Sequence, residues 1–267
     1  MEKLIFLGTG NGTVTDCYNT CFILQNNDKN ILVDAGGGNG ILTQLKKANI
    51  KTESIHDVII SHNHMDHLIG LFWVMRDVAR LMNLGKYDGV LNIYCHKSIK
   101  DISIPFLDAV FPHQWIKGYK ERTFFHNIED QQERVIGDYK IKFMNLYENK
   151  GLQFGFKTRL NNNETLAFLG DIPCDEKLYP DLADIDWFIH EAYCLYNEAE
   201  KYDAYNKGHG TVKETSQIAQ QLNVKNLVLQ HLQDNDLPNR KKLYTKESKE
   251  YFTGNVFVPN DLETIEL

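Results

Sequence analysis

Three histidines and one aspartate lie within six consecutive residues of this chain: His62, His64, Asp66 and His67. They follow the apolar run 55–60, whose β-branched residues predict a buried strand. If the backbone stays extended beyond that strand, His62 and His64 point to the same side. Asp66 and His67 then fall on the turn into the next helix. Imidazole and carboxylate suit zinc, iron or manganese, so the spacing predicts ligands for two neighbouring metal ions. The competing interpretation is a polar strand-to-helix turn that happens to be rich in histidine.

The pattern His62-x-His64-x-Asp66-His67 resembles the signature of the metallo-β-lactamase superfamily. This resemblance implies an α/β fold, a four-layer αβ/βα sandwich in which two mixed sheets are flanked by helices. It also implies a dinuclear site at one edge that holds two divalent metal ions. Zinc is the favoured metal, with manganese and iron as alternatives. Further segments support the resemblance, which covers nearly the whole chain.

Composition sets the broad class of the protein. The 267 residues contain no Pro- or Ser-rich linker and no break in composition, which predicts a single hydrolase domain over 1–267. The formal net charge of −7 argues against broad binding to nucleic acid or to an acidic membrane, although a local basic patch stays open. The first residues are too quickly polar for a signal peptide, and no apolar run approaches the roughly 18 residues of a membrane span. Five scattered cysteines without CxxC spacing fit reduced thiols. We therefore expect a cytoplasmic protein without membrane contact.

The elements that must position the histidines follow from hydrophobic periodicity. In the first half we expect strands at 3–7, 20–24, 31–36, 55–60 and 91–95, and helices at 41–48 and 67–82. The glycine loop 8–12 is not followed by an amphipathic helix, so dinucleotide binding is not favoured, and the resemblance places this loop beside the metal site. Asp34 is expected to hydrogen-bond backbone amides or a ligand histidine rather than to bind metal itself.

The region 96–126 is the least regular part of the chain and mixes large aromatic residues with lysines. Such mixing can mark contact with nucleic acid. A helical insert that packs its aromatic side chains inward and exposes its lysines is favoured, and a role in lining the substrate site is left open.

The second half is predicted to repeat the alternation of strands and helices. We expect hairpins over 135–146 and 154–169, strands at 187–191, 226–230 and 255–259, a helix at 212–222 capped by Thr211, and a solvated surface helix or loop at 238–250. Two βα halves packed face to face would follow.

Three of these strands lead to ionisable residues, namely Asp171, Glu191 and His231, and His209 lies on a loop. Functional residues gathered at strand ends on one edge of a sheet are typical of an α/β active site. The competing interpretations are that Asp171 caps a turn and that Glu191 and His209 form a structural ion pair.

The later segments narrow the resemblance. The residues around Glu191, His209 and His231 resemble ribonuclease Z and related phosphodiesterases, and the pairing of Glu191 with His209 distinguishes them from lactonases and thioesterases. The resemblance implies two metal sites, one held by His62, His64 and Asp171, and the other by Asp66, His67, Asp171 and His231. It makes Asp66 the general base toward a metal-activated water. His209, kept protonated by Glu191, becomes the acid that protonates the leaving alkoxide.

The chain departs from the family pattern in two places. The family has a third histidine on the first metal, but residues 143–150 contain none. Tyr147 is the residue favoured for the position of this histidine, with Glu148 and Asn149 as alternatives. An oxygen ligand in that position would make the first metal site harder, which favours manganese or iron. The alternative is that the first metal site is weak or empty. The chain also lacks the long basic Gly/Pro-rich arm with which ribonuclease Z grips transfer RNA.

The sequence therefore predicts a metal-dependent hydrolase, a phosphodiesterase acting on a small phosphodiester or nucleotide-like substrate. The alternatives are an ester, thioester or lactone hydrolase on the same metals, and a catalytically impaired metal- or nucleotide-binding module. Processing of tRNA 3′ ends and binding of RNA are less favoured, and a homodimer is left open.

Overall fold

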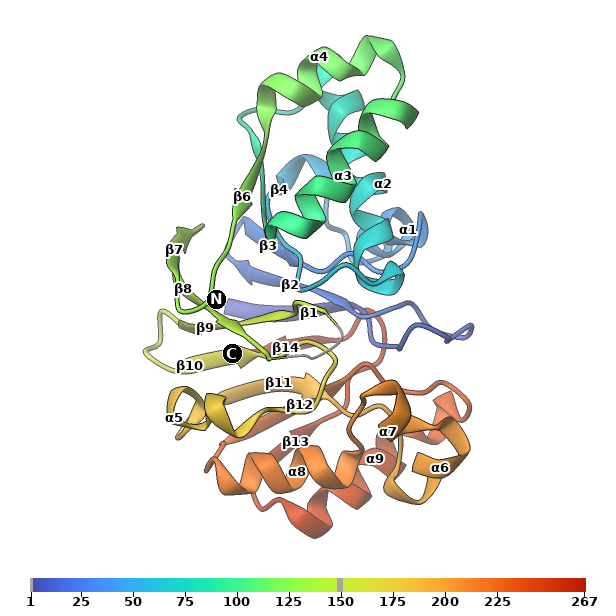
Figure 1. The fold of residues 1–267 in the computed structure, drawn as a ribbon, viewed down its shortest axis with the longest axis vertical. Coiled ribbons are helices and arrows are strands. Elements are labelled where there is room, and N and C mark those ends of the chain that lie inside the picture. Colours follow the sequence, from blue (N-terminus) through green and yellow to red (C-terminus); the bar gives the residue numbers. More distant parts are fainter. Residues whose placement is uncertain (1, 148–150) are drawn as a thin grey trace.

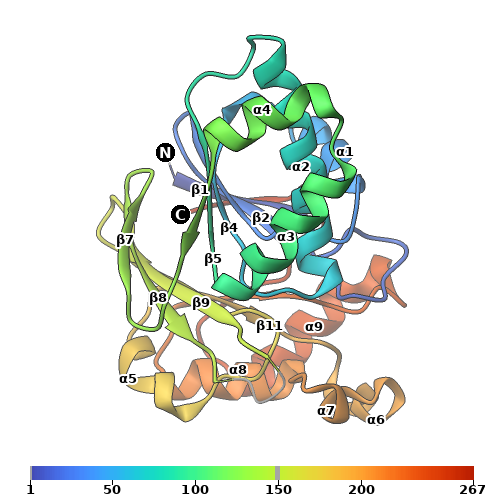
Figure 2. The ribbon, with the colours of Figure 1, turned by 45° about the horizontal axis from the view of Figure 1, so that its top comes forward.

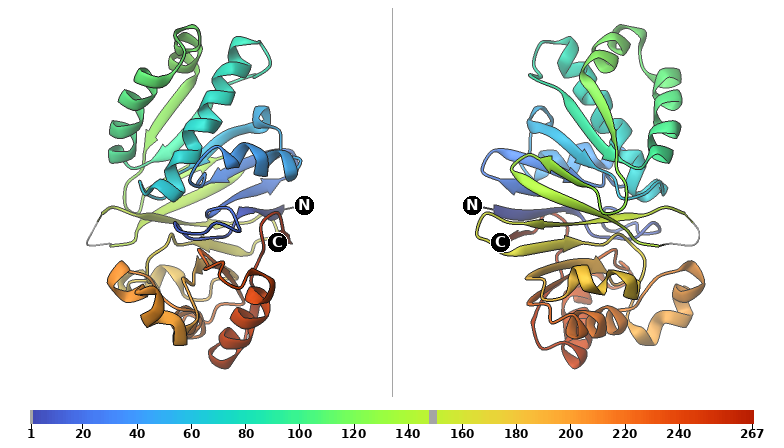
Figure 3. Two further views of the ribbon diagram at one scale, coloured as in Figure 1. Left: turned by 90° about the vertical axis from the view of Figure 1, so that its right-hand side faces the viewer. Right: turned by 60° about the vertical axis from the view of Figure 1, so that its left-hand side comes forward.

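The computed structural model describes residues 2–147 and 151–267. Within them, the strands form two seven-stranded mixed sheets that stack on each other, and helices cover both outer faces (Figure 1). Figure 3 shows the resulting order of layers, with helices outside and strands between them. The expected four-layer sandwich of two mixed sheets flanked by helices is confirmed.

The first sheet joins the two ends of the chain. Its strands, in spatial order, are β14 (Thr264–Glu266), β1 (Glu2–Gly8), β2 (Cys21–Asn26), β3 (Lys29–Val33), β4 (Ile55–Ile59), β5 (Leu91–Cys95) and β6 (Thr123–Asn127). Pairing is antiparallel from β14 to β3 and parallel from β3 to β6. The parallel strands end at the same edge, which is where β4 delivers the histidine segment.

The second sheet repeats this plan. Its strands, in spatial order, are β13 (Asn255–Phe257), β12 (Asn226–Gln230), β11 (Trp187–Glu191), β10 (Thr165–Phe168), β9 (Phe154–Arg159), β8 (Tyr139–Asn145) and β7 (Glu133–Ile136). The four strands β10 to β13 are parallel, and the predicted hairpins appear as β7–β8 and β9–β10.

Helices enclose the sheets on both sides (Figure 2). Those over the first sheet are α1 (Gly40–Lys47), α2 (Met65–Asn83), α3 (Lys97–Val110) and α4 (His113–Arg122). Those on the side of the second sheet are α5 (Tyr179–Leu182), α6 (Ala199–Tyr202), α7 (Ala204–Lys207), α8 (Val212–Gln221) and α9 (Leu237–Tyr251). In the described part of the chain, no helix combines the length and the apolar character needed to cross a membrane.

Three large hydrophobic clusters fill the spaces between the four layers. Strand β1 shows how one strand serves two of them. Ile5 and Leu7 belong to the cluster under the helices, whereas Leu4 and Phe6 belong to the cluster between the sheets. Because successive side chains of a strand point to opposite faces, a strand in a middle layer is apolar on both faces.

Some local expectations need correction. Region 96–126 is indeed helical, but Phe106 and Phe124 are each 44% exposed, so its aromatic side chains do not all pack inward. The same region ends in strand β6, which was not predicted. Strand β14, at the other edge of the same sheet, was not predicted either. Segment 238–250 is a helix, but it is not merely a solvated surface element, since Arg240 and Tyr244 are buried.

Candidate metal centre and acid–base pair

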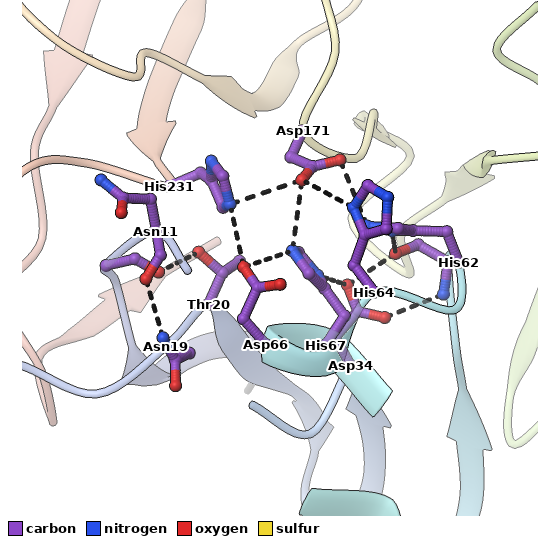
Figure 4. A network of polar contacts seen from close by, with 12 residues as sticks. Asn11, Asn19, Thr20, Asp34, His62, His64, Asp66, His67, Asp171 and His231 are labelled. Atoms are coloured by element: carbon purple, nitrogen blue, oxygen red, sulfur yellow. Dashed lines mark hydrogen bonds and ion pairs between the residues drawn. The ribbon is translucent and has the colours of Figure 1, made fainter. Parts of the chain in front are cut away.

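The predicted site residues come together at one edge of the sandwich, where strand ends of both sheets meet (Figure 4). Two groups of them share Asp171, and the ligand atoms of each group lie within 4.8 Å of one another, as do those of a third group, Glu191, His209 and His231. Of the two groups that share Asp171, one is Asp66, His67, Asp171 and His231, and the other is His62, His64 and Asp171. Asp171 belongs to both groups, as expected for a bridging carboxylate.

The first of these groups has the spacing of a tetrahedral site. Oδ2 of Asp171 lies 3.5 Å from Nε2 of His67 and 3.4 Å from Nε2 of His231. Oδ2 of Asp66 lies at 3.5 Å and 3.4 Å from the same two nitrogen atoms. A tetrahedral ion with bonds of about 2.1 Å holds its ligand atoms about 3.4 Å apart. The four side chains therefore fit one divalent ion.

The second group is more open. Nε2 of His62 lies 3.5 Å from Oδ1 of Asp171, and Nδ1 of His64 lies 3.9 Å from Oδ2 of the same carboxylate. His62 is buried, but the His64 side chain is 61% exposed. In Figure 4, Asp171 lies between His231 on one side and the two histidines on the other.

Unpartnered buried atoms support metal binding at both groups. Nε2 of His62, Nε2 of His67 and Oδ1 of Asp171 are buried without a hydrogen-bond partner. Leaving such an atom unpaired costs about 1–3 kcal/mol. Divalent ions would supply the missing partners, so the residues present fit two metal ions.

Asp34 holds the histidines in place from below. This buried carboxylate accepts hydrogen bonds from the backbone amide and the hydroxyl of Ser61, at 2.8 and 2.7 Å, and from Nδ1 of His67 at 2.8 Å. Because the Ser61 hydroxyl donates its proton to Asp34, the same hydroxyl oxygen accepts a hydrogen bond from Nδ1 of His62 at 2.9 Å. Both imidazoles are thereby left with Nε2 facing the cluster. The expected contacts of Asp34 with a backbone amide and a histidine of the cluster are confirmed.

Glycine allows helix α2 to approach the sheet closely at this point. A Cβ on Gly70 would lie 1.8 Å from the carbonyl oxygen of Ala35. The amide of Gly70 donates to the carbonyl of Gly36 at 2.8 Å, and the amide of Ala35 donates to the carbonyl of His67 at 2.9 Å. These contacts fix the first turn of α2, and with it the imidazole of His67.

The glycine loop after β1 lies beside the cluster, as the resemblance implied. A Cβ on Gly12 would lie 3.0 Å from Oδ2 of Asp66. The side chain of Asn11 donates to the carbonyl of Leu232 at 3.2 Å, which ties the loop to the residue after His231. The loop thus connects ligands that come from the two sheets.

Charge and burial set the protonation of the cluster. Burial raises the pKa of Asp171, but His62 and His231 outweigh it and hold that pKa well below its usual range. The pKa of Asp66 is lowered in the same way, chiefly by His67 acting against burial. Burial also lowers the pKa of His62 well below 6.5. These ionised carboxylates and the neutral imidazole of His62 are forms that bind metal. Burial lowers the pKa of His67, but Asp34 and Asp66 outweigh burial and raise that pKa, so a metal ion there must displace a proton.

An acid–base pair lies next to the metal cluster. Nδ1 of His209 is 2.8 Å from Oε2 of the buried Glu191 and 2.7 Å from the backbone oxygen of Asp171. Both partners can only accept, so Nδ1 carries a proton. Oε1 of Glu191 accepts from the amide of Gly210 at 2.8 Å, which fixes the carboxylate. Burial raises the pKa of Glu191. Burial lowers the pKa of His209, but the hydrogen bond to Glu191 and the negative charge of Glu191 outweigh burial and raise the pKa of His209 to about 9.

A cavity of about 200 Å³ opens over both features. It is lined by His62, Asn63, His64, Gly151, Leu152, Gln153, Asp171, Ile172, Lys207 and His209. The sequence did not indicate Gln153, Lys207 or the nearby Tyr193. The Tyr193 ring stacks on His209 with centroids 4.3 Å apart, and Nζ of Lys207 donates to its hydroxyl at 3.2 Å. Lys207 lies two residues before His209 and Tyr193 two residues after Glu191, and this proximity was the sequence signal for both.

The slot of the missing third histidine is not filled by Tyr147, and that prediction was wrong. The Tyr147 hydroxyl donates to the exposed Asp130 at 3.4 Å, and Nζ of Lys177 lies 4.7 Å from the ring centroid. The phenol is thus engaged by residues outside the cluster, and Tyr147 is not among the described residues that line the cavity. The alternatives Glu148 and Asn149 lie outside the described residues.

Comparison with known proteins agrees with this architecture. Ribonuclease Z from Bacillus cereus (strain B4264) is 24% identical over 314 aligned positions, which cover 98% of each chain. The metallo-β-lactamase fold protein YhfI from Bacillus subtilis superposes with a TM-score of 0.80, at 21% identity over 99% of this chain and 98% of that one. Human tRNase Z, short form, superposes with a TM-score of 0.75, at 20% identity over 99% and 98% of the two chains.

The chain has the fold of the metallo-β-lactamase fold protein YhfI, and its clustered histidines and aspartates lie at one edge of that fold. Residues 2–250 match the family described as Anti-Pycsar protein Apyc1. Because this match spans nearly the whole chain, the chain belongs to that family.

Proposed function

We propose that this chain is a metal-dependent phosphodiesterase that hydrolyses a small, nucleotide-like or cyclic phosphodiester. The observation that carries the proposal is the position of His209. Its Nδ1 is held by Glu191, and its ring lines the same cavity as His62, His64 and Asp171. A proton donor fixed beside a two-metal cluster suits a reaction in which an alkoxide leaves.

Two divalent ions held by the two groups would clamp the phosphoryl oxygens and activate a water molecule. The side chains of the chain supply the proton transfers. Asp66, 18% exposed at the cluster, accepts a proton from the attacking water as the new P–O bond forms. His209 gives its Nε2 proton to the leaving oxygen as the other P–O bond breaks. Glu191 keeps the imidazole protonated and oriented for this step.

Size and charge favour a small substrate over transfer RNA. The cavity of about 200 Å³ accommodates a phosphodiester with part of a sugar. The net charge of −7 opposes the binding of a long polyanion. The alignment with ribonuclease Z spans 314 positions, whereas this chain has 267 residues, so that relative has segments that this chain lacks.

Hydrolysis of a carboxylic ester, thioester or lactone is the rival activity on the same metals. A thiolate leaves without protonation, so a thioesterase would have little use for the buried Glu191 that holds His209. The pair therefore favours the phosphodiesterase over the thioesterase, and the lactone assay below tests the rival that also expels an alkoxide.

Parallel assays on one metal-loaded preparation test the proposal. The substrates are 3′,5′-cyclic nucleotides, an aryl phosphodiester, a thioester and a lactone. The proposal expects turnover of the phosphodiesters at least about 100-fold above that of the other two. Turnover of the thioester or lactone alone would replace it with the rival activity. Stoichiometric binding of a nucleotide without turnover under zinc, manganese and iron would identify a binding module.

A further inference from the structure

The two groups of metal ligands contain different numbers of side chains. The inference drawn from this difference rests on the proposed function, which requires both metal ions. One group offers four side chains, Asp66, His67, Asp171 and His231, whereas the other offers only three, His62, His64 and Asp171. Tyr147, the residue favoured by the sequence for the missing position, bonds to Asp130 instead. Another donor at the cavity would complete this group.

Gln153 lies at the right place in the fold. Its carbonyl oxygen accepts from the amide of Leu146 at 2.9 Å, just beyond the end of β8, where the family carries its histidine. The amide of the next residue, Phe154, donates to the carbonyl of Ser61 at 2.9 Å. Gln153 is thus joined by backbone hydrogen bonds to the end of β8, and its neighbour is joined to the residue before His62.

The side chain of Gln153 is buried, and the residue lines the cavity over the cluster. The residue is 3% exposed, yet its Oε1 has no hydrogen-bond partner. It lines the same cavity as His62 and Asp171. A Cβ built on Gly170, the residue before Asp171, would lie 2.8 Å from Oε1. Glycine at 170 therefore leaves the space that the amide oxygen occupies, one residue before Asp171 in the chain.

We propose that Oε1 of Gln153 is the missing ligand of the first metal ion, in the place of the family histidine. The first site then has two imidazoles, one carboxylate oxygen and one neutral amide oxygen. Amide oxygen is a harder and weaker donor than imidazole, so this site favours manganese over zinc more than a site with a third histidine in this position would. The two ions should load unequally, with the site of Asp66, His67, Asp171 and His231 filling first.

Metal binding by the full-length chain tests this proposal without any assay of hydrolysis. Metal-free protein is titrated with Mn²⁺, and bound ions are counted by calorimetry and by elemental analysis after gel filtration. The variants are Gln153→Met, which keeps the volume and removes the oxygen, and Gln153→Glu, which keeps an oxygen and adds charge. Gln44→Met is the matched control, since this buried glutamine donates to the carbonyl of Leu7 at 2.7 Å and lies outside the cavity.

The proposal expects two Mn²⁺ ions in the wild type, in Gln153→Glu and in Gln44→Met. In Gln153→Met, the affinity of the weaker site falls by at least about 10-fold while the tighter site is unchanged. The unchanged site also shows that the variant is folded. Two ions bound by Gln153→Met with wild-type affinities would overturn the proposal, as would loss of the weaker ion in Asn149→Ala alone. Wild-type protein that binds two ions through Gln153 but hydrolyses no phosphodiester would refute the proposed function and leave this ligand assignment standing.

Discussion

Nδ1 of His209 lies 2.8 Å from Oε2 of Glu191, a carboxylate with no exposed surface. A buried charge is stable only with a partner, and the imidazolium is the partner that the structure provides. The pair is therefore coupled in charge as well as in geometry, and its two members should respond together to mutation.

Glu191→Gln tests this coupling. The substitution keeps the size of the side chain but removes the charge that raises the pKa of His209. We expect the His209 resonance in metal-free protein to titrate at a lower pH than in the wild type, and kcat on a cyclic nucleotide to fall by about 100-fold or more. NMR titration and steady-state kinetics measure the two effects. An unchanged His209 titration would show that Glu191 does not set the protonation of this ring.

Stability should depend on pH through the same residue. The pKa of His209 rises from 6.5 to about 9 in the folded metal-free protein. The folded state therefore binds the proton more tightly than the unfolded chain, so this stabilisation is fully present below pH 6.5 and disappears as the pH rises through about 9. We expect the free energy of unfolding of chelator-treated protein, measured in urea, to fall more between pH 6 and pH 9.5 in the wild type than in Glu191→Gln. Equal losses in the two proteins would contradict the assignment to this pair.

Asp34→Asn tests how the ligand histidines are held. Asp34 accepts from Nδ1 of His67 and from the hydroxyl of Ser61. An amide is uncharged and presents only one accepting oxygen, so His67 loses orientation and basicity. We expect metal affinity to fall by about 10–100-fold, as measured by competition with a chelating dye. Wild-type affinity in a folded variant would show that the Asp34 contact does not tune the site.

Gly70→Ala tests the close approach of α2 to the loop after β3. The added Cβ would lie 1.8 Å from the backbone oxygen of Ala35, and a backbone atom cannot move aside cheaply. We expect the free energy of unfolding to fall by about 2 kcal/mol or more, with weaker metal binding at His67. Gly38→Ala is the control, since a Cβ there meets nothing within 4 Å, and it should change stability by less than about 0.5 kcal/mol. Similar unfolding curves for the two variants would remove the packing argument.

Much of the metal cluster could be predicted because its residues follow apolar strands or lie in one short motif. His62 follows β4, Asp171 follows β10 and His231 follows β12, and periodicity locates such strands. The structure brings these residues into one cluster. Sequence spacing alone had predicted such proximity only within the histidine segment 62–67.

Other features depend on contacts that are distant in the sequence. β14 is three residues long and exists because it pairs with β1 at the opposite end of the chain. α9 reads as polar, but Arg240 is buried because its guanidinium donates to the Thr9 hydroxyl at 2.7 Å. Gln153 carries no charge and belongs to no motif, so only its burial and its unpaired oxygen reveal it.

The most direct test of the proposed acid role compares two leaving groups in His209→Ala. The substrates are a cyclic nucleotide, which must expel an alkoxide, and an aryl phosphodiester, whose phenolate leaves without protonation. Metal content is measured on the same samples. If His209 protonates the leaving group, the variant keeps its metal ions and loses at least about 100-fold in kcat on the cyclic nucleotide, but far less on the aryl ester. Equal losses on both substrates, or no loss on either, would contradict that role.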